Sequence, residues 1–180
     1  EGDIFKEDFG GASVVTMYLL PHLNLCVRHR ILALEPGTRV VSHKYTMADW
    51  EPEKSVTVLG REIHLWTVPA RVDGAWEFRD SQGTAFTLDL RQAFGKVEGE
   101  ISRADFRAPL TGTVHGRELR LEYAEAGSTV RASGTVRGDE ITATILAGGS
   151  ARTATGRPKG AHTPGAWARM PPECRRYYER

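Results

Sequence analysis

Residues 12–43, ASVVTMYLLPHLNLCVRHRILALEPGTRVVSH, decide the fold class of the first part of the chain. Residues 12–20 form a nearly continuous apolar run of strand length, which is typical of a strand buried on both faces. Pro21 ends this run. Residues 39–43 (RVVSH) make a second short strand, so two strands flank a segment of about twenty residues.

The segment between these strands has the spacing of a helix. From His22 to Leu34, apolar side chains recur every three or four positions, which predicts a helix with one apolar stripe (Leu23, Val27, Ile31 and Leu34). The turn Glu35-Pro36-Gly37-Thr38 then stops the helix. Strand, helix, tight turn and strand together predict a βαβ unit, which requires a parallel strand pair with a right-handed crossover.

The pattern changes after residue 54 to short alternating segments separated by glycine turns. Glu62–Val68 and Ala75–Phe78 flank Asp73-Gly74, which predicts a hairpin on which Trp66 and Trp76 face each other. Further strand patterns recur every 8–12 residues up to residue 146, as expected for a meander or a small barrel. Residues 147–164 are rich in Gly, Ala and Thr and are interpreted as loop. We therefore expect two domains, residues 1–80 and residues 81–180.

Composition restricts the function classes. The 180 residues are 40% hydrophobic and 26% charged, which is typical of a globular protein. A net charge of +1 argues against nucleic acid as a partner, and the basic end, residues 174–180, is interpreted as a solvated terminus. No apolar run reaches the roughly 20 residues of a membrane span. Two cysteines, Cys26 and Cys174, exclude a cysteine zinc motif; reduced thiols are the default expectation, with a single bridge left open.

Three stretches, in order, carry a family resemblance: Gly2-Asp3-Ile4-Phe5, then residues 14–21, then residues 34–43. They resemble the later motifs of class I, Rossmann-like S-adenosylmethionine-dependent methyltransferases. Tyr45–Trp50 (YTMADW) resembles a bacterial branch with a similar M-G-D-W stretch, and residues 65–76 resemble the β-rich segment that this branch carries behind the methyltransferase domain. The resemblance is continuous over roughly the first 80 residues, and it implies an α/β, partial Rossmann-like sheet followed by an all-β meander or small barrel.

Members of this family have a seven-stranded sheet in the order 3-2-1-4-5-7-6. The resemblance implies that residues 14–20 are the fourth strand and residues 39–43 the fifth, and that the 62–68 and 75–78 hairpin supplies the last two. The first strand and its G-x-G-x-G loop have no counterpart in this sequence. We therefore expect the C-terminal half of a methyltransferase domain, a fragment of a larger enzyme that is itself inactive or severely weakened.

The resemblance also assigns candidate site residues. Asp3 would accept a hydrogen bond from the adenine amino group of S-adenosylmethionine, with Ile4 and Phe5 packing on the ring. Thr16 would lie beside the cofactor at the carboxyl end of its strand, the edge at which open α/β sheets bind ligands. At the same edge Tyr18 would orient the methyl acceptor and His43 would act as a base, because histidine changes charge near neutral pH.

Each assignment has a structural alternative. Asp3 and Phe5 fit an acidic turn beside a core aromatic residue, Tyr18 fits a half-buried strand tyrosine, and His43 fits a strand-end histidine with satisfied hydrogen bonds. His22 and His29 have no carboxylate to complete a metal site, so no metal is expected and both are assigned to solvent.

Three readings of the whole chain remain open. In the first, the chain is the inactive or severely weakened portion of a methyltransferase. Its methyl acceptor is then an unknown small molecule or protein, and its cofactor suggests a cytoplasmic location. In the second, the β-rich segment from Phe86 onward is an independent barrel that binds a ligand or partner without catalysis. In the third, the chain is a structural fragment without activity. Because residues 14–20 would lack a neighbouring strand, the first reading also predicts self-association through that apolar edge.

Overall fold

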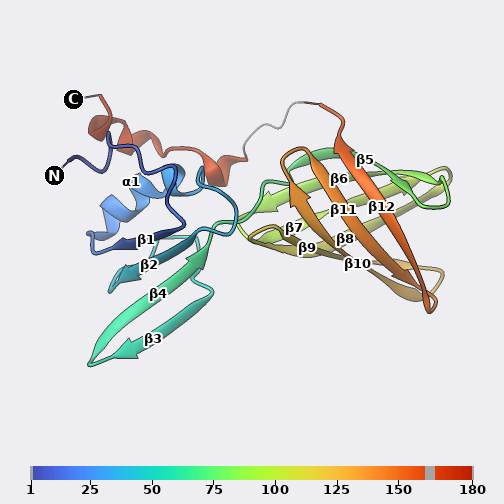
Figure 1. Cartoon of the computed structure of the whole chain (residues 1–180), viewed down its shortest axis with the longest axis horizontal. Helices are drawn as coiled ribbons and strands as arrows, with labels where there is room; N and C mark the ends of the chain where they lie inside the picture. Colours follow the sequence, from blue (N-terminus) through green and yellow to red (C-terminus); the bar gives the residue numbers. More distant parts are fainter. Residues whose placement is uncertain (1, 161–164, 180) are drawn as a thin grey trace. The chain divides into compact units, whose positions relative to one another are not determined.

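The structure is a computed structural model that describes residues 2–160 and 165–179. The chain divides into two compact units, one formed by Glu1–Pro69 with Ala168–Arg180 and the other by Ala70–Trp167 (Figure 1). The division at residue 69 lies about ten residues before the boundary expected from the sequence. The end of the chain returns to the first unit, so this unit is built from two segments that are far apart in the sequence.

The first unit contains a four-stranded sheet in the order β1-β2-β4-β3. Strand β1 (Val14–Met17) and strand β2 (Arg39–His43) are parallel, in the register Val14 opposite Arg39, and helix α1 (Pro21–Ile31) joins them. The parallel pair agrees with the βαβ pattern predicted from the sequence. Strand β4 (Arg61–Thr67) lies antiparallel to β2 on one side and to β3 (Lys54–Val58) on the other.

Helix α1 is shorter than the predicted helix and ends three residues earlier, at Ile31. Pro21 occupies its first turn, where a missing N–H costs nothing. The expected apolar stripe is present, because Val27, Ile31 and Leu34 are buried and Leu23 is half-buried. Gly37 has a φ of +99°, which lets the chain reverse into β2.

Strand β1 differs from its prediction. It ends at Met17 and is not buried on both faces: Val14 and Thr16 are exposed and Met17 alone of its four residues is fully buried. The reason is its position, since β1 is an edge strand whose partner among the described residues is β2. The apolar run therefore leaves Val14, Tyr18 and Leu20 exposed by 42%, 66% and 52%.

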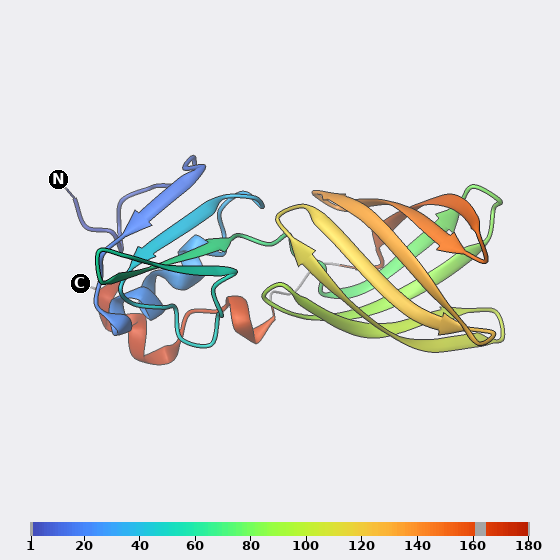
Figure 2. The same ribbon diagram turned by 90° about the horizontal axis from the view of Figure 1, so that it is seen from below.

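The second unit is a closed eight-stranded barrel, which confirms the small-barrel alternative (Figure 2). Each strand pairs antiparallel with the next in sequence, and the last strand closes the barrel on the first. The strands are β5 (Gly74–Asp80), β6 (Ala85–Ala93), β7 (Lys96–Arg103), β8 (Phe106–His115), β9 (Glu118–Glu125), β10 (Ser128–Arg137), β11 (Glu140–Ala147) and β12 (Ser150–Pro158). Two 3-10 helices follow, η1 (Ala166–Ala168) and η2 (Pro172–Tyr177).

Alternating side chains fill the barrel interior. In β9, Leu119, Leu121 and Tyr123 are buried while Glu118, Arg120 and Glu122 face outward. The inward side chains of the other strands join them in one apolar core. This core gives the barrel the burial that a stable domain needs.

The predicted 62–68 and 75–78 hairpin is wrong. Trp66 lies in β4 of the first unit and donates its indole N–H to the carbonyl of Trp50 at 2.8 Å. Trp76 lies in β5 of the barrel and donates to the carbonyl of Val72 at 2.9 Å. The two tryptophans are packing residues of different units, so they do not face each other on one hairpin.

The loop predicted for residues 147–164 is also wrong over Ser150–Pro158, which form β12. This strand carries small residues because its neighbour is crowded. A Cβ atom at Gly156 would lie 2.4 Å from Cζ of Phe78, so the Phe78 ring fills the space that a side chain would need. Of the predicted loop, residues 161–164 lie outside the described residues.

Candidate functional site

The carboxyl ends of β1 and β2 bring Tyr18 and His43 together. Their ring centroids lie 4.5 Å apart and the ring planes meet at 84°, an edge-to-face contact. Tyr18 is largely exposed, whereas His43 is half-buried and its Nδ1 is buried without a hydrogen-bond partner among the described residues. The pair that the sequence nominated from two separate strands is therefore one structural unit.

Thr16 lies on the same strand, two residues before Tyr18. It is exposed and pairs with Val41 of β2. Because strand side chains alternate between faces, Thr16 projects on the side opposite to buried Met17. Its hydroxyl is thus accessible beside the Tyr18–His43 pair.

Residues 3–5 form a tight turn ahead of β1. The Asp3 carboxylate accepts a hydrogen bond from the Phe5 N–H at 3.0 Å, and the Asp3 carbonyl accepts from Lys6 and Glu7, both at 2.8 Å. Asp3 remains exposed. The turn is acidic and beside an aromatic residue, as the structural alternative for Asp3 and Phe5 predicts, and it also leaves a carboxylate accessible to a ligand.

Arg30 of α1 fastens this turn. Its guanidinium donates to the carbonyls of Ile4 and Glu7, the latter at 2.6 Å, and it lies 4.6 Å from the ring centre of Phe9. Arg30 therefore fixes the position of the 3–5 turn relative to α1.

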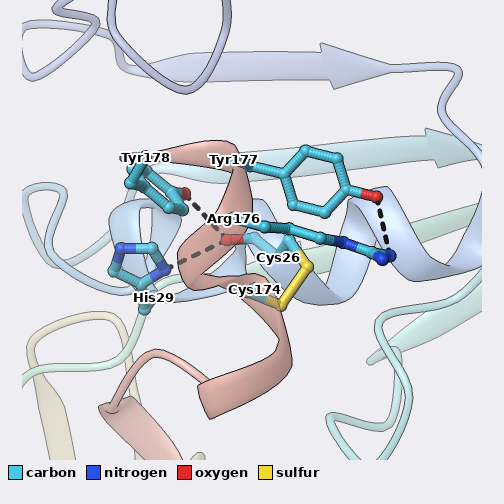
Figure 3. Close-up of a disulfide and its surroundings, with 6 residues drawn as sticks. All are labelled: Cys26, His29, Cys174, Arg176, Tyr177 and Tyr178. Carbon is cyan, nitrogen blue, oxygen red and sulfur yellow. Dashed lines mark hydrogen bonds between the residues drawn. A yellow bond between two sulfur atoms is a disulfide. The ribbon is translucent and has the colours of Figure 1, made fainter. Parts of the chain in front are cut away.

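The end of the chain also reaches this turn, which the sequence did not predict. Cys174 of η2 forms a disulfide with Cys26 of α1, so the expectation of reduced thiols is wrong (Figure 3). The Tyr177 ring stacks on Phe5 with centroids 4.9 Å apart. The terminus is thus docked on the first unit through Cys174 and Tyr177, whereas the basic side chains of Arg175 and Arg176 are exposed to solvent, as expected from the sequence.

His29, assigned to solvent from the sequence, takes part in this docking. It is half-buried, its Nδ1 lies 3.1 Å from the Cys26 carbonyl, and its ring meets Tyr178 edge-on at 5.0 Å. Burial lowers the pKa of His29, the charge of Arg30 lowers it further, and the Cys26 carbonyl partly offsets both. Because a carbonyl oxygen only accepts, Nδ1 of His29 carries the proton and donates it to that oxygen.

A buried polar network supports the loop after β2. Asn24 of α1 donates to the carbonyls of Tyr45 and Thr46 at 3.1 and 3.2 Å. Arg28 donates to the carbonyl of Met47 at 2.9 Å and pairs with Asp49. Partial burial raises the pKa of Asp49, but the hydrogen bond and charge of Arg28 outweigh it, so this pKa lies below its ordinary value.

The same loop explains the M-A-D-W sequence. Ala48 has a φ of +58°, in the left-handed region that favours glycine, and it occupies the position of Gly in the M-G-D-W stretch that it resembles. Buried Trp50 follows and accepts the Trp66 indole N–H. The motif therefore acts as a support for β2 and β4.

The barrel interior offers little room for a ligand. The hollow lined by its inward apolar side chains, such as Leu88, Leu110 and Ile141, holds about 30 Å³, close to the volume of one water molecule. Small-molecule sites are typically at least tenfold larger. Among the described residues, no three His, Cys, Asp or Glu side chains gather to hold a metal ion.

No helix in the described part of the chain has the length and apolar character needed to cross a membrane.

Comparison with known proteins finds relatives of part of the chain, of which two are described. A protein-lysine N-methyltransferase from Saccharolobus islandicus (strain REY15A) is 39% identical over 73 residues, which are 38% of this chain and 45% of that protein. An RNA methyltransferase from Salinibacter ruber, solved in complex with S-adenosyl-L-homocysteine, is 41% identical over 40% of this chain and 48% of that one, with a TM-score of 0.39. No protein-family model matches the chain.

The identity to the lysine methyltransferase confirms the resemblance to S-adenosylmethionine-dependent methyltransferases for the part of the chain that it covers. The chain spans about half the length of both relatives. The relatives differ in the acceptor that their names give, protein lysine in one and RNA in the other.

Proposed function

We propose that residues 1–69 carry the C-terminal half of a methyltransferase domain that uses S-adenosylmethionine, and that the barrel is an appended domain. The observation that carries this proposal is the sheet order β1-β2-β4-β3. In the family order 3-2-1-4-5-7-6, these strands correspond to strands 4, 5, 7 and 6. The directions also agree, because β1 and β2 are parallel and β4, the counterpart of strand 7, is antiparallel to both neighbours.

This correspondence changes the assignment made from the sequence. Strands β3 and β4 take the last two places, which the sequence had given to the segments at 62–68 and 75–78. It also accounts for the position of β1 at the edge of the sheet. In the family, strand 1 lies beside strand 4, which is the counterpart of β1. A hollow of about 280 Å³ beside that edge, lined by Ile4, Phe9, Val15, Met17, Val27 and Ile31 among others, offers an apolar surface for the missing neighbours.

The residues of this chain fit one part of the cofactor. Asp3 is an exposed carboxylate suited to accept from the adenine amino group, and Ile4 and Phe5 supply apolar surface for its ring. Thr16 offers an exposed hydroxyl at the carboxyl end of β1. The glycine-rich strand-to-helix turn that would hold the remainder of the cofactor has no counterpart in these 180 residues. We therefore expect this chain alone to bind the cofactor weakly or not at all.

The Tyr18–His43 pair is proposed to serve the acceptor. When bound, S-adenosylmethionine supplies a methyl group that is attached to a positively charged sulfur, and this sulfur is a good leaving group. The protein then has to align the acceptor and remove its proton. Tyr18 presents an exposed hydroxyl that can hydrogen-bond an acceptor, and half-buried His43, whose ring centroid lies 4.5 Å from that of Tyr18, is proposed as the base.

The acceptor and location stay predictions. A small molecule or a protein is the expected acceptor from the near-neutral charge, and the name of the lysine methyltransferase relative is compatible with a protein. The cofactor suggests a cytoplasmic location. The Cys26–Cys174 disulfide favours an oxidising environment instead, since such bonds are uncommon in reducing compartments.

Calorimetric titration with S-adenosyl-L-homocysteine tests the proposal. Two proteins are compared: this chain, and a longer version in which strands 1–3 of a related methyltransferase precede Gly2. The longer protein should bind the ligand and this chain should bind at least about a hundredfold more weakly, since most cofactor contacts lie in the added strands. Absence of binding by both proteins would contradict the methyltransferase assignment.

A matched control separates cofactor contacts from folding. Phe5→Ala in the longer protein should weaken binding, whereas Phe86→Ala, a substitution in the barrel, should leave the affinity unchanged. Equal effects of both substitutions would indicate general destabilisation.

A further inference from the structure

The C-terminal segment Ala168–Glu179, here called the tail, belongs to the first unit and is held there at several points. A disulfide joins Cys174 to Cys26, and both cysteines are buried. The Tyr178 hydroxyl donates to the Cys26 carbonyl at 2.8 Å, and the His29 ring meets the same oxygen, as the two converging dashed lines in Figure 3 show. Burial raises the pKa of Tyr178, the charge of Arg30 partly offsets this rise, and the charge of Asp3 adds to it.

Beyond the disulfide, the tail covers Phe5 with two aromatic rings. Tyr177 lies almost parallel to Phe5, with centroids 4.9 Å apart and planes at 21°, and Tyr178 meets Phe5 edge-on at 5.3 Å. For a third ring to fit between two stacked rings, the two outer rings must lie about 7 Å apart, which is twice the contact distance of carbon atoms. An adenine therefore cannot pack on this face of Phe5 while Tyr177 occupies it.

We propose that the tail is a disulfide-held autoinhibitory strap, in which Tyr177 occupies the Phe5 face that would receive adenine. This inference rests on the proposed function. When the strap is docked, a smaller fraction of the protein is able to bind an adenosine ligand, and the apparent affinity falls in proportion to that fraction. Without the disulfide, the tail keeps only its ring contacts and hydrogen bonds, and it leaves Phe5 for a larger fraction of the time.

Release requires a reductant, and we name a dithiol for that role. The Cys26–Cys174 bond breaks, each sulfur takes one proton and one electron, and the dithiol gives up two protons and two electrons to become a disulfide. Both sulfurs are buried, so the reductant reaches them when the short helix η2 opens locally. The strap is therefore expected to respond over minutes or longer.

The test uses the full chain, with S-adenosyl-L-homocysteine as the probe at millimolar concentration. Binding is followed by nuclear magnetic resonance through the Ile4 methyl signals, and tail docking by hydrogen exchange of residues 171–179. The samples are the oxidised chain, the chain reduced with dithiothreitol, Cys174→Ser, and Tyr177→Ala with its disulfide intact. Glu173→Ala, an exposed substitution in the same helix, is the matched control for the oxidised chain.

We expect about a tenfold lower apparent dissociation constant in the reduced chain, in Cys174→Ser and in Tyr177→Ala than in the oxidised chain. Tyr177→Ala is decisive, because it removes the occupying ring and keeps the bond. Tyr177→Phe keeps the ring and should behave like the oxidised chain. Equal or tighter binding by the oxidised chain would overturn the strap while leaving the proposed function in place. Absence of binding in every sample, with the tail released on reduction, would overturn the strap, and titration of the longer protein would then decide the proposed function.

Discussion

The rings of Tyr18 and His43 meet at 84°, with centroids 4.5 Å apart, at the carboxyl ends of two parallel strands. Two residues that are 25 positions apart in the sequence thus share one edge of the sheet, at the place where open α/β sheets bind ligands. The contact exists only because β1 and β2 run parallel. It is the geometry from which the catalytic proposal proceeds.

The first prediction concerns this pair. In the longer protein, with an acceptor found by screening, His43→Ala should lower kcat by roughly 10²- to 10⁴-fold, the usual contribution of a general base. The affinity for S-adenosyl-L-homocysteine should change little, because His43 is assigned to the acceptor. Steady-state kinetics with calorimetry separates the two effects.

Tyr18→Phe gives the comparison for that experiment. It keeps the ring that packs on His43 and removes the hydroxyl, so it should raise KM more than it lowers kcat. If His43→Ala and Tyr18→Phe both leave kcat and KM unchanged, the pair is structural, as the alternative assignment of each residue states.

The second prediction concerns the free edge of β1. Val14 and Thr16 are exposed on an edge strand with unpaired backbone groups, so the isolated chain should self-associate at tens of micromolar. Val14→Lys should reduce this association, because a lysine on an edge strand opposes strand pairing. Light scattering measures the molar mass in both cases.

Val56→Lys is the matched control, because Val56 is an exposed residue of β3 at the opposite edge of the same sheet. If both substitutions act equally, association is a general property of the apolar surface. A monomeric wild-type chain would contradict the prediction.

The third prediction concerns pH and Asp80 at the end of β5. Its carboxylate is buried and accepts from the N–H groups of Gln82 and Thr84 at 3.0 and 2.8 Å, with Arg152 at 3.5 Å. Burial raises the pKa of Asp80, but these hydrogen bonds and the charge of Arg152 hold it below the ordinary value. The folded state therefore binds this proton less readily than the unfolded state does.

It follows that the free energy of unfolding of the barrel decreases as pH falls below the ordinary aspartate pKa of about 4 and on through the folded pKa. Urea denaturation between about pH 5 and about pH 3 should show that the free energy of unfolding falls more steeply with decreasing pH in the wild type than in Asp80→Asn. Asp105→Asn, an exposed substitution in the β7–β8 turn, should keep the wild-type slope. Equal slopes in wild type and Asp80→Asn would refute this account.

The fourth prediction concerns Gln92, which is buried in β6. Its side chain accepts from the Val72 N–H at 2.8 Å and donates to the carbonyls of Ala70 and Phe94 at 2.9 and 2.7 Å. Gln92→Ala removes the side-chain partner of these three backbone groups, two of which are buried, and should lower the free energy of unfolding by about 2 kcal/mol. Gln82→Ala, exposed in a turn, should change it by less than about 0.5 kcal/mol. A small effect at Gln92 would mean that water replaces the side chain.

The sequence predicts the local elements well where the periodicity is strong. The spacing of Val27, Ile31 and Leu34 identified α1, and the Pro-Gly turn before β2 led to the parallel pair. The glycine turns after residue 80 led to the barrel. These signals are local, so short segments of sequence are enough to reveal them.

Long-range pairings are not encoded in such spacing. The Asp73-Gly74 signal suggested a hairpin, yet β4 pairs with β2 and β3, and β5 pairs with β6 and β12. The sequence did not predict strand β12, because this segment, with Gly156 and its small neighbours, shows no alternation of apolar and polar residues. The Cys26–Cys174 bond spans 148 positions, and neither cysteine has a neighbouring motif that signals it.

In the proposed site, adenine lies against residues 3–5 and the reacting methyl group lies near residues 16–18. Photo-crosslinking of S-adenosylmethionine to the longer protein, followed by mass spectrometry, tests this placement. We expect labelled peptides that contain residues 3–5 or 16–18, and competition by S-adenosyl-L-homocysteine. Label confined to the barrel, residues 70–167, or label that the competitor leaves in place, would contradict it.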